Sequence, residues 1–256
     1  MNLFFRSYGT GPPFVILHGL FGISDNWVTL GKKFGETFHV LIPDLRNHGQ
    51  SPHSPRFDFP SIEEDILELI EQEAHSPVFL MGHSLGGRVV VNLALHHPRL
   101  ISKLVIVDIS LRKYPPHAEH LELLKAMQDI KLNNVHSRTE VERQLQERVP
   151  SLKLRQFLLK NLYWREKGQL SWRLNLPAIT ENLPSIFEGG SVTGLYPGPA
   201  LFLRGGKSDF LLDEDIPEIH KQFPGSTVVT VEGASHWVHA DNPGEFFRIV
   251  KAFLDI

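Results

Sequence analysis

Short apolar runs alternate with longer amphipathic stretches along this chain, a pattern typical of βαβ units and a parallel sheet. Each run is brief and mostly apolar, as expected for a strand that is covered on both faces. The predicted strands are Leu3–Arg6, Phe14–Leu17, His39–Ile42, Val78–Met81, Leu104–Val107, Ala200–Leu203 and Thr227–Val231. The pattern therefore predicts an α/β fold, with one mostly parallel sheet flanked by helices.

Helix starts are marked at three places. Ser61 with Glu64, and Ser137 with Glu140, each have the spacing of a capping box before an apolar stripe. The segment Pro243–Leu254 has a proline in its first turn, where a helix tolerates it, so we expect a closing helix there.

The alternation stops between Leu111 and Gly198, where only helical patterns are found. Three apolar stripes carry them, formed by Leu121, Leu124 and Met127, by Val141, Leu145 and Val149, and by Leu154, Phe157, Leu158 and Leu162. We interpret residues 111–198 as a helical cap inserted into a core of residues 1–110 and 199–256. The alternative is that these helices cover one face of the sheet, but their position between two consecutive strands favours the cap.

The segment Gly82-His83-Ser84-Leu85-Gly86 reads G-x-S-x-G, and it lies between a predicted strand and a helical stretch. This strand-turn-helix context is the one that a nucleophile elbow requires. The glycines let strand and helix approach closely, and the sharp turn holds the serine in a strained conformation. The alternative is a glycine-rich turn with a chance serine. We predict that Ser84 is a catalytic nucleophile.

A serine hydroxyl needs a base within hydrogen-bond reach, and that base must be oriented by a third group. His236 follows the last predicted strand, at the sheet edge where such folds place their chemistry. His239 is its nearest rival, and we expect it to pack or to cap the final helix. A metal site on these two histidines is a further alternative, but no H-E-x-x-H motif or carboxylate cluster supports it, so no metal is expected.

Two aspartates compete for the third position. Asp209 follows the predicted strand Ala200–Leu203, and Asp108 ends the predicted strand Leu104–Val107. Both lie between Ser84 and His236 in the chain, which is the order that this architecture requires. We prefer Asp209 and keep Asp108 as the alternative.

Backbone N–H groups are expected to stabilise the oxyanion that forms during acyl transfer. One donor is Leu85, the residue after the nucleophile, and the other comes from the turn after Phe14–Leu17. In that turn we expect Leu20 first and Phe21 next. The polar loop Asp44–Ser51 is expected to brace the turn through hydrogen bonds.

Composition narrows the class further. A chain of 256 residues that is 41% apolar can bury one sizeable core. The absence of cysteine excludes disulfides, Cys-ligated zinc and a cysteine nucleophile. A net charge of −3 without a basic stripe argues against nucleic-acid binding. The first residues do not read as a signal peptide, and no run is long enough to span a bilayer, so we expect a cytoplasmic protein.

Together these segments resemble the α/β-hydrolase superfamily and, within it, the YbfF-type esterases and their mitochondrial abhydrolase relatives. The motifs that carry the resemblance are His18-Gly19-Leu20-Phe21-Gly22, Asp44-Leu45-Arg46-Asn47-His48-Gly49, Gly82-His83-Ser84-Leu85-Gly86-Gly87, Val107-Asp108-Ile109, Trp172-Arg173-Leu174-Asn175, Arg204-Gly205-Gly206-Lys207-Ser208 and His236-Trp237-Val238-His239-Ala240. The resemblance implies an eight-stranded type of sheet with a helical lid, here beginning about one strand later than in longer members. It also implies hydrolysis of carboxylic esters or acyl-CoA thioesters.

The resemblance supports Ser84 and His236 as site residues. It favours Asp108 as the acid, because members of this family often lack an aspartate at the position of Asp209, whereas the wider superfamily pattern favours Asp209.

The leading hypothesis is a serine hydrolase that acts on a small-molecule ester or thioester through an acyl-serine intermediate, without a cofactor. A carbon–carbon bond hydrolase or an acyltransferase with the same three residues is the first alternative, and a ligand-binding protein on a hydrolase scaffold is the second. We expect an apolar substrate site to which Trp164, Trp172 and Trp237 contribute. A monomer is favoured.

Overall fold

The computed structural model describes residues 1–75, 77–114, 118–188 and 193–255. Within them, a seven-stranded sheet has the order β1-β3-β2-β4-β5-β8-β9. Its strands are β1 (Phe5–Tyr8), β2 (Pro13–Leu17), β3 (His39–Pro43), β4 (Val78–His83), β5 (Ile101–Val107), β8 (Ala200–Gly205) and β9 (Ser226–Val231). All neighbours pair in parallel except β1, which is antiparallel to β3. The predicted mostly parallel sheet is confirmed, with shifts only at strand ends.

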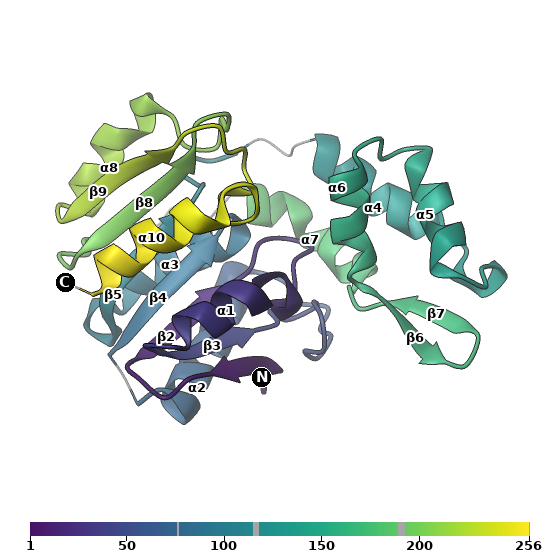
Figure 1. The fold of residues 1–256 in the computed structure, drawn as a ribbon, viewed down its shortest axis with the longest axis horizontal. Helices are drawn as coiled ribbons and strands as arrows, with labels where there is room; N and C mark the ends of the chain where they lie inside the picture. The colour runs from purple at the N-terminus through teal and green to yellow at the C-terminus, as the bar shows by residue number, and fades with distance from the viewer. Residues whose placement is uncertain (76, 115–117, 189–192, 256) are drawn as a thin grey trace.

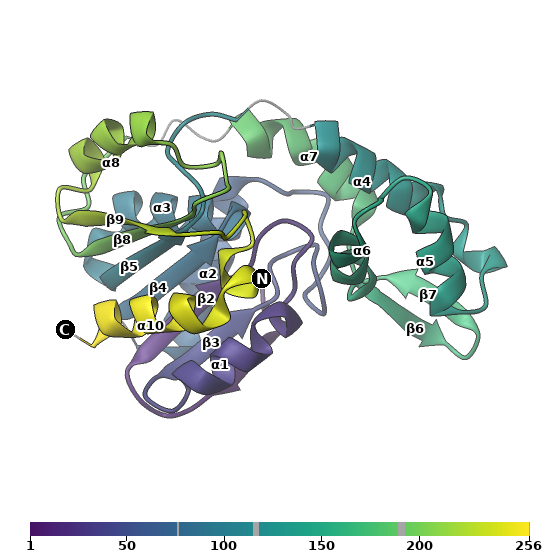
Figure 2. The same cartoon turned by 45° about the horizontal axis from the view of Figure 1, so that its top comes forward.

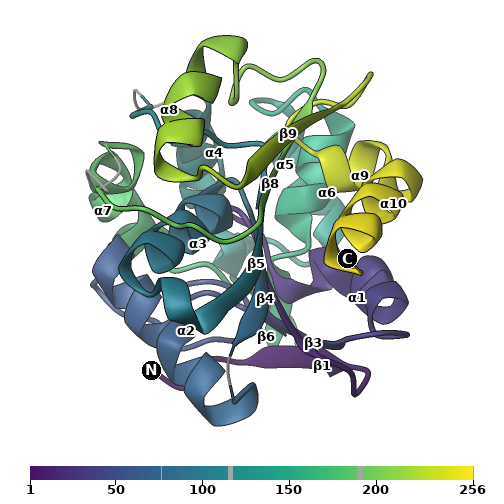
Figure 3. The same cartoon turned by 90° about the vertical axis from the view of Figure 1, so that its left-hand side faces the viewer.

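Helices cover both faces of this sheet, as Figure 3 shows. One face carries α2 (Phe59–Glu73), α3 (Leu85–His96) and α8 (Ile216–Gln222), and the other carries α1 (Val28–Phe34) and α10 (Pro243–Leu254). A further short helix, α9 (Val238–Asp241), precedes α10. Short 3-10 turns occupy Ser24–Trp27, Pro98–Leu100, Leu132–Asn134 and Asp213–Asp215.

The apolar runs of the strands divide between these two faces. In β2, Val15 and Leu17 belong to the cluster beneath α2 and α3, whereas Phe14 and Ile16 belong to the cluster beneath α1 and α10. Successive strand residues point to opposite faces, and both faces are buried, so the run has no polar alternation. All four side chains are fully buried.

Two predicted helix starts are confirmed and one is wrong. The closing helix begins at Pro243, and the hydroxyl of Ser137 accepts the backbone N–H of Glu140 at 3.2 Å, at the start of α5. Helix α2, however, is capped by Asp58, whose carboxylate accepts the N–H of Ser61 at 2.8 Å. Asp58 is an equally good cap and lies three residues earlier, so Ser61 is inside the helix.

Between β5 and β8 the chain builds a second group of elements, which lies at one end of the sheet (Figures 1 and 2). Its described elements, called the cap below, are α4 (Ala118–Asp129), α5 (Arg138–Gln146), α6 (Leu152–Leu159), β6 (Leu162–Glu166), β7 (Gln169–Trp172) and α7 (Leu176–Glu188). Residues 115–117 and 189–192 of the predicted cap lie outside the described residues.

The expectation of a purely helical cap is wrong, because β6 and β7 form an antiparallel hairpin. Leu162 fitted the third helical stripe, but α6 ends at Leu159 and Leu162 pairs with Trp172 in the hairpin. Gly168 makes the connecting turn with a φ of 83°, a conformation that glycine adopts without strain. None of the helices in the described ranges has the length and apolar character needed to cross a bilayer.

Candidate active site

Ser84 lies in the sharp turn between β4 and α3, with φ 52° and ψ −116°. Strand and helix meet so closely that a Cβ atom on Gly82 would lie 2.1 Å from the carbonyl oxygen of Gly86. A Cβ atom on Gly86 would lie 2.6 Å from the carbonyl oxygen of Leu17 in β2. The two glycines are therefore required by the close approach. The surrounding packing holds a serine conformation that costs about 1–3 kcal/mol.

His236 and Asp108 meet at the same edge of the sheet. His236 follows β9 and Asp108 follows β5, and the imidazole Nδ1 lies 2.7 Å from the carboxylate Oδ2. Asp108 is fully buried, and it also accepts the N–H of Gly205 at 2.8 Å and the hydroxyl of Ser208 at 2.5 Å. An ionised carboxylate only accepts hydrogen bonds, so Nδ1 carries the proton. The Nε2 atom of His236 is then left free to act as a base.

The preference for Asp209 as the partner of this imidazole is wrong. Asp209 is exposed, and its backbone oxygen accepts a hydrogen bond from the guanidinium of Arg112. The chain after β8 turns so that Ser208, the residue before it, contacts Asp108. The alternative, Asp108, is the carboxylate that contacts His236, in agreement with the family resemblance.

His83 supports the loop that carries His236. Its Nε2 donates to the backbone oxygen of His236 at 2.9 Å, and the two ring centroids are 4.7 Å apart. Burial lowers the pKa of His83 to about 3, so this imidazole is neutral near pH 7. On its other side, the ring of His236 stacks on Phe210 at 3.9 Å. The general-base candidate is thus held by a carboxylate, a backbone contact and an aromatic ring.

His239 is buried and stacks on Trp27 with ring centroids 4.2 Å apart. Burial lowers its pKa well below the ordinary value, so this imidazole is neutral as well. In the part of the chain that the structure describes, no three His, Cys, Asp or Glu side chains are grouped in a way that could hold a metal ion.

Two backbone N–H groups beside Ser84 are candidates for an oxyanion hole. Leu85 is the first residue of α3, so its N–H has no acceptor within the helix. The N–H of Leu20 has no acceptor among the described residues. The expectation that Phe21 offers a donor in this turn is wrong. Its φ is 61°, and its N–H donates to Nε2 of His48 at 3.2 Å. That N–H is therefore already used.

Two buried histidines brace this turn, and one of them, His48, belongs to the loop Asp44–Ser51, whose charged and amide side chains were expected to do so. His18 accepts the N–H of Leu45 at 3.0 Å on Nε2, and its Nδ1 donates to the carbonyl of Gly19 at 2.8 Å. In the same way His48 accepts from the turn and donates from Nδ1 to a backbone carbonyl of its own loop. Burial lowers the pKa of His18 to about 4 and that of His48 to about 3. Both rings can accept a backbone N–H only because they are neutral.

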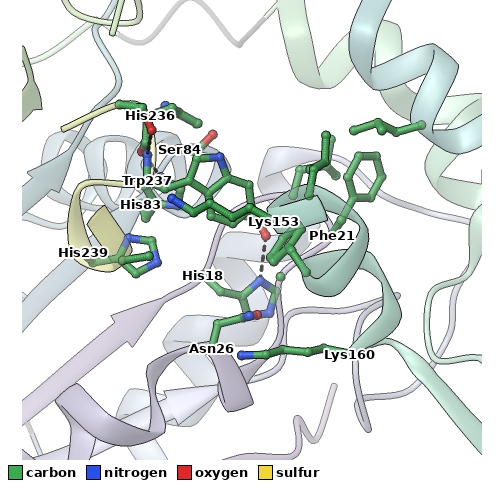
Figure 4. Close-up of a pocket in the computed structure, with 18 of the residues that line it drawn as sticks. His18, Phe21, Asn26, His83, Ser84, Lys153, Lys160, His236, Trp237 and His239 are labelled. Atoms are coloured by element: carbon green, nitrogen blue, oxygen red, sulfur yellow. Dashed lines mark hydrogen bonds between the residues drawn. The ribbon is translucent and has the colours of Figure 1, made fainter. Parts of the chain in front are cut away.

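A cavity of about 520 Å³, called the wide cavity below, opens beside Ser84 between core and cap (Figure 4). His236, Trp237 and His239 line it from the core, and Leu154 and Phe157 line it from α6 of the cap. Apolar atoms account for most of the surface of this wall, but more than half of its lining residues are polar or charged, Glu119, Lys153 and Lys160 among them. Such a mixture is typical of a small-molecule site.

Of the three tryptophans expected at the substrate site, the structure places one there. Trp237 lines the wide cavity. Trp172 is buried inside the cap, where its Nε1 donates to the carbonyl of Met127 at 3.2 Å, and Trp164 is 46% exposed on β6. Trp27 and Phe210 line the cavity instead. Nothing in their local sequence separates them from core aromatics, because only the packing of the cap on the core places them at the site.

Comparisons with known proteins agree with this geometry. A family model described as the alpha/beta hydrolase fold matches residues 12–243. The sn-1-specific diacylglycerol lipase ABHD11 of Danio rerio is 37% identical over 256 residues, which cover 98% of this chain and 80% of that protein. Esterase YbfF of Escherichia coli is 29% identical over 243 residues, 95% of this chain and 93% of that one. A solved structure of a marine microorganism esterase superposes with a TM-score of 0.95 at 37% identity, over 98% of this chain and 99% of that chain.

The chain therefore belongs to the α/β-hydrolase family and, within it, to the YbfF-type group of esterases and lipases. The fold class and the resemblance predicted from the sequence are confirmed.

Proposed function

We propose that this protein hydrolyses carboxylic esters through an acyl intermediate on Ser84, with His236 as general base and acid and Asp108 as its carboxylate partner. The observation that supports this most directly is the 2.7 Å contact between His236 Nδ1 and Asp108 Oδ2, at the sheet edge that carries the strained serine. Carboxylate, imidazole and serine hydroxyl in this arrangement form the constellation that activates serine in acyl transfer.

Acylation begins when Ser84 Oγ attacks the ester carbonyl carbon and its proton passes to Nε2 of His236. Asp108 stabilises the imidazolium that forms, and it keeps the ring in the tautomer whose Nε2 faces the substrate. The bond from the carbonyl carbon to the leaving oxygen then breaks, and that oxygen takes the proton from Nε2. The acyl group is left on Ser84.

The negative charge that develops on the carbonyl oxygen is proposed to be held by the N–H groups of Leu20 and Leu85. One such donor is typically worth about 2.7–4 kcal/mol in the transition state. Deacylation repeats the sequence with water: His236 takes the proton of the water, whose oxygen attacks the acyl carbon, and Ser84 leaves with that proton. Apart from the substrate and this water, every group in these steps belongs to the chain itself.

The substrate class is proposed as small-molecule esters and, by the same steps, thioesters. The relatives described above, a diacylglycerol lipase and two esterases, support the ester class. The apolar side chains that line the wide cavity, such as Leu154, Phe157 and Trp237, support a substrate with an apolar part.

Rapid mixing with p-nitrophenyl acetate tests the proposed function. We expect a burst of p-nitrophenol equal to the enzyme concentration, followed by slower turnover as the acyl group is hydrolysed. The Ser84→Ala variant is expected to show neither phase. Turnover that survives in Ser84→Ala, or that begins without covalent acylation, would contradict the proposal.

A further inference from the structure

Two spaces of very different size meet at Ser84. One is the wide cavity of about 520 Å³, and the other is a slot of about 30 Å³, called the narrow slot below. Both spaces are lined by Leu20, Ser84, His120 and Phe210. A substrate whose carbonyl carbon is placed at Ser84 therefore extends one part into each space.

The narrow slot is mostly apolar. Its walls besides the shared residues come from the core and from the cap, and they consist of Phe59, Leu85, Arg88, Ile109, Tyr114, Ile186 and Phe187. The guanidinium of Arg88, its one charged side chain, donates to the carbonyls of Ser110 and Arg112 at 3.1 and 2.8 Å. Those bonds engage the charge with the protein, so the slot offers apolar surface to a ligand.

The two spaces differ in their relation to the general base. His236 lines the wide cavity and is not part of the wall of the narrow slot. Phe210 stacks on the His236 ring at 3.9 Å and lines both spaces, so it stands as the partition between the base and the slot. The leaving oxygen must lie beside His236 Nε2 to receive its proton. The leaving group is thereby directed into the wide cavity, and the acyl chain into the slot.

We propose that the narrow slot is the acyl subsite, that it limits the enzyme to short acyl chains on large leaving groups, and that Ile186 of α7 sets the length. This inference rests on the proposed function. A space of about 30 Å³ gives room to about two water-sized groups, which corresponds to acyl chains of about two to four carbons. Ile186 is 7% exposed and contributes to the slot but not to the wall of the wide cavity.

Two matched ester series test the direction and the size together. The first lengthens the acyl chain on a fixed leaving group, from p-nitrophenyl acetate through butyrate to octanoate. The second lengthens the alcohol on a fixed acetyl group, from ethyl to octyl acetate. We expect kcat/KM to fall by about tenfold or more between butyrate and octanoate, because a pocket discriminates strongly against added methylenes that it cannot hold. It should change little along the alcohol series.

Ile186→Ala should move the acyl limit toward longer chains and leave the alcohol series unchanged. Leu154→Ala is the matched control, because it removes a similar apolar side chain from the wall of the wide cavity. It should leave the acyl profile unchanged. If Ile186→Ala does not fold, Ile186→Val should give a smaller shift in the same direction, and the two series on the unaltered enzyme remain informative alone.

Tolerance of long acyl chains together with rejection of long alcohols would overturn the assignment, since it would place the acyl group in the wide cavity. An acyl profile that responds to Leu154→Ala and not to the Ile186 variants would overturn it as well. Failure of the proposed function looks different: no ester in either series would acylate Ser84, and a fluorophosphonate probe would leave Ser84 unlabelled.

Discussion

Asp108 holds its carboxylate in a fully buried position with three hydrogen-bond donors around it: His236, Gly205 and Ser208. Its own φ is 51°, in the region that side chains other than glycine seldom adopt. Backbone strain of this kind persists only where the surroundings fix the residue, and it is often found at functional sites. The carboxylate is therefore set in place before a substrate arrives.

Asp108→Asn is predicted to lower kcat by about 10⁴-fold, because the amide would favour the wrong tautomer of His236. Asp209→Asn is the matched control: it changes a neighbouring exposed aspartate, and its activity should remain close to that of the unaltered protein. Steady-state kinetics on p-nitrophenyl acetate measure both. An inactive Asp209→Asn variant together with an active Asp108→Asn variant would show that Asp108 is not the carboxylate partner of His236.

The buried histidines predict a loss of stability in mild acid. His18 and His48 have folded-state pKa values of about 4 and about 3, both below the value of 6.5 that an unfolded chain would show. Between these folded-state pKa values and 6.5, the unfolded state binds more protons than the folded state. The free energy of unfolding therefore falls as the pH drops below about 6.5. Each histidine contributes a slope of about 1.4 kcal/mol per pH unit.

Urea unfolding at several values between pH 5 and pH 8 checks this dependence. His48→Gln keeps an oxygen that can accept the N–H of Phe21 and removes one titrating group, so the slope below pH 6.5 should decrease by one proton. His220→Gln, on an exposed histidine of α8, should leave the slope unchanged. Equal slopes in all three proteins would argue against neutral, buried imidazoles at the turn.

Ser84 and His236 could be selected as candidates from the sequence, because a short motif and a strand end mark them locally. It could not separate Asp108 from Asp209, since both follow strands at the same edge and the choice depends on how the loop after β8 folds back. Nor could the sequence show that the N–H of Phe21 is already engaged in a hydrogen bond. The acceptor is His48, which lies 27 residues away in the sequence.

At the scale of elements, one buried side chain joins the cap to the turn at residues 18–22, which carries the proposed oxyanion donor Leu20. Asn161 lies between α6 and β6, is fully buried, and donates from Nδ2 to the carbonyl of Phe21 at 2.8 Å. The backbone carbonyl of Asn161 accepts the backbone N–H of Arg173 at 2.7 Å. The hairpin and the turn beside Ser84 thus share a fixed point, so the position of the cap is coupled to the position of Leu20.

Asn161→Leu is predicted to lower kcat between about tenfold and 100-fold with a smaller change in KM, because a small displacement of the turn misplaces the oxyanion donor. It should also destabilise the protein by about 1–3 kcal/mol through the unpaired Phe21 carbonyl. Asn182→Leu is the control, since Asn182 also donates from the cap to a core carbonyl, that of Pro55, but at an exposed position. Equal kinetic effects of the two variants would contradict a role at the turn.

The sheet was predictable at this scale and the cap was not. The five inner strands are mostly apolar runs covered on both faces, so the sequence alone identifies them, whereas the edge strands β1 and β9 are only partly buried. In the cap, the spacing of Leu158 and Leu162 fits a helix and also fits the start of β6 after a helix end. Only pairing with β7 decides between them, and pairing is a tertiary property.

At the scale of the whole molecule, the core supplies the groups of the proposed mechanism from loops after β2, β4, β5 and β9, and the cap closes the space above them. The parallel strands bring these loops to one edge, although Leu20 and His236 lie 216 positions apart in the chain. The central claim is that this edge activates one serine for covalent catalysis.

Covalent labelling tests that claim most directly. The protein is treated with a fluorophosphonate, which reacts with activated serines, and the adduct is located by peptide mapping in the mass spectrometer. The account predicts one adduct per chain, on Ser84, with labelling slowed in Asp108→Asn and absent in Ser84→Ala. An adduct on another residue, or labelling that persists in Ser84→Ala, would contradict it.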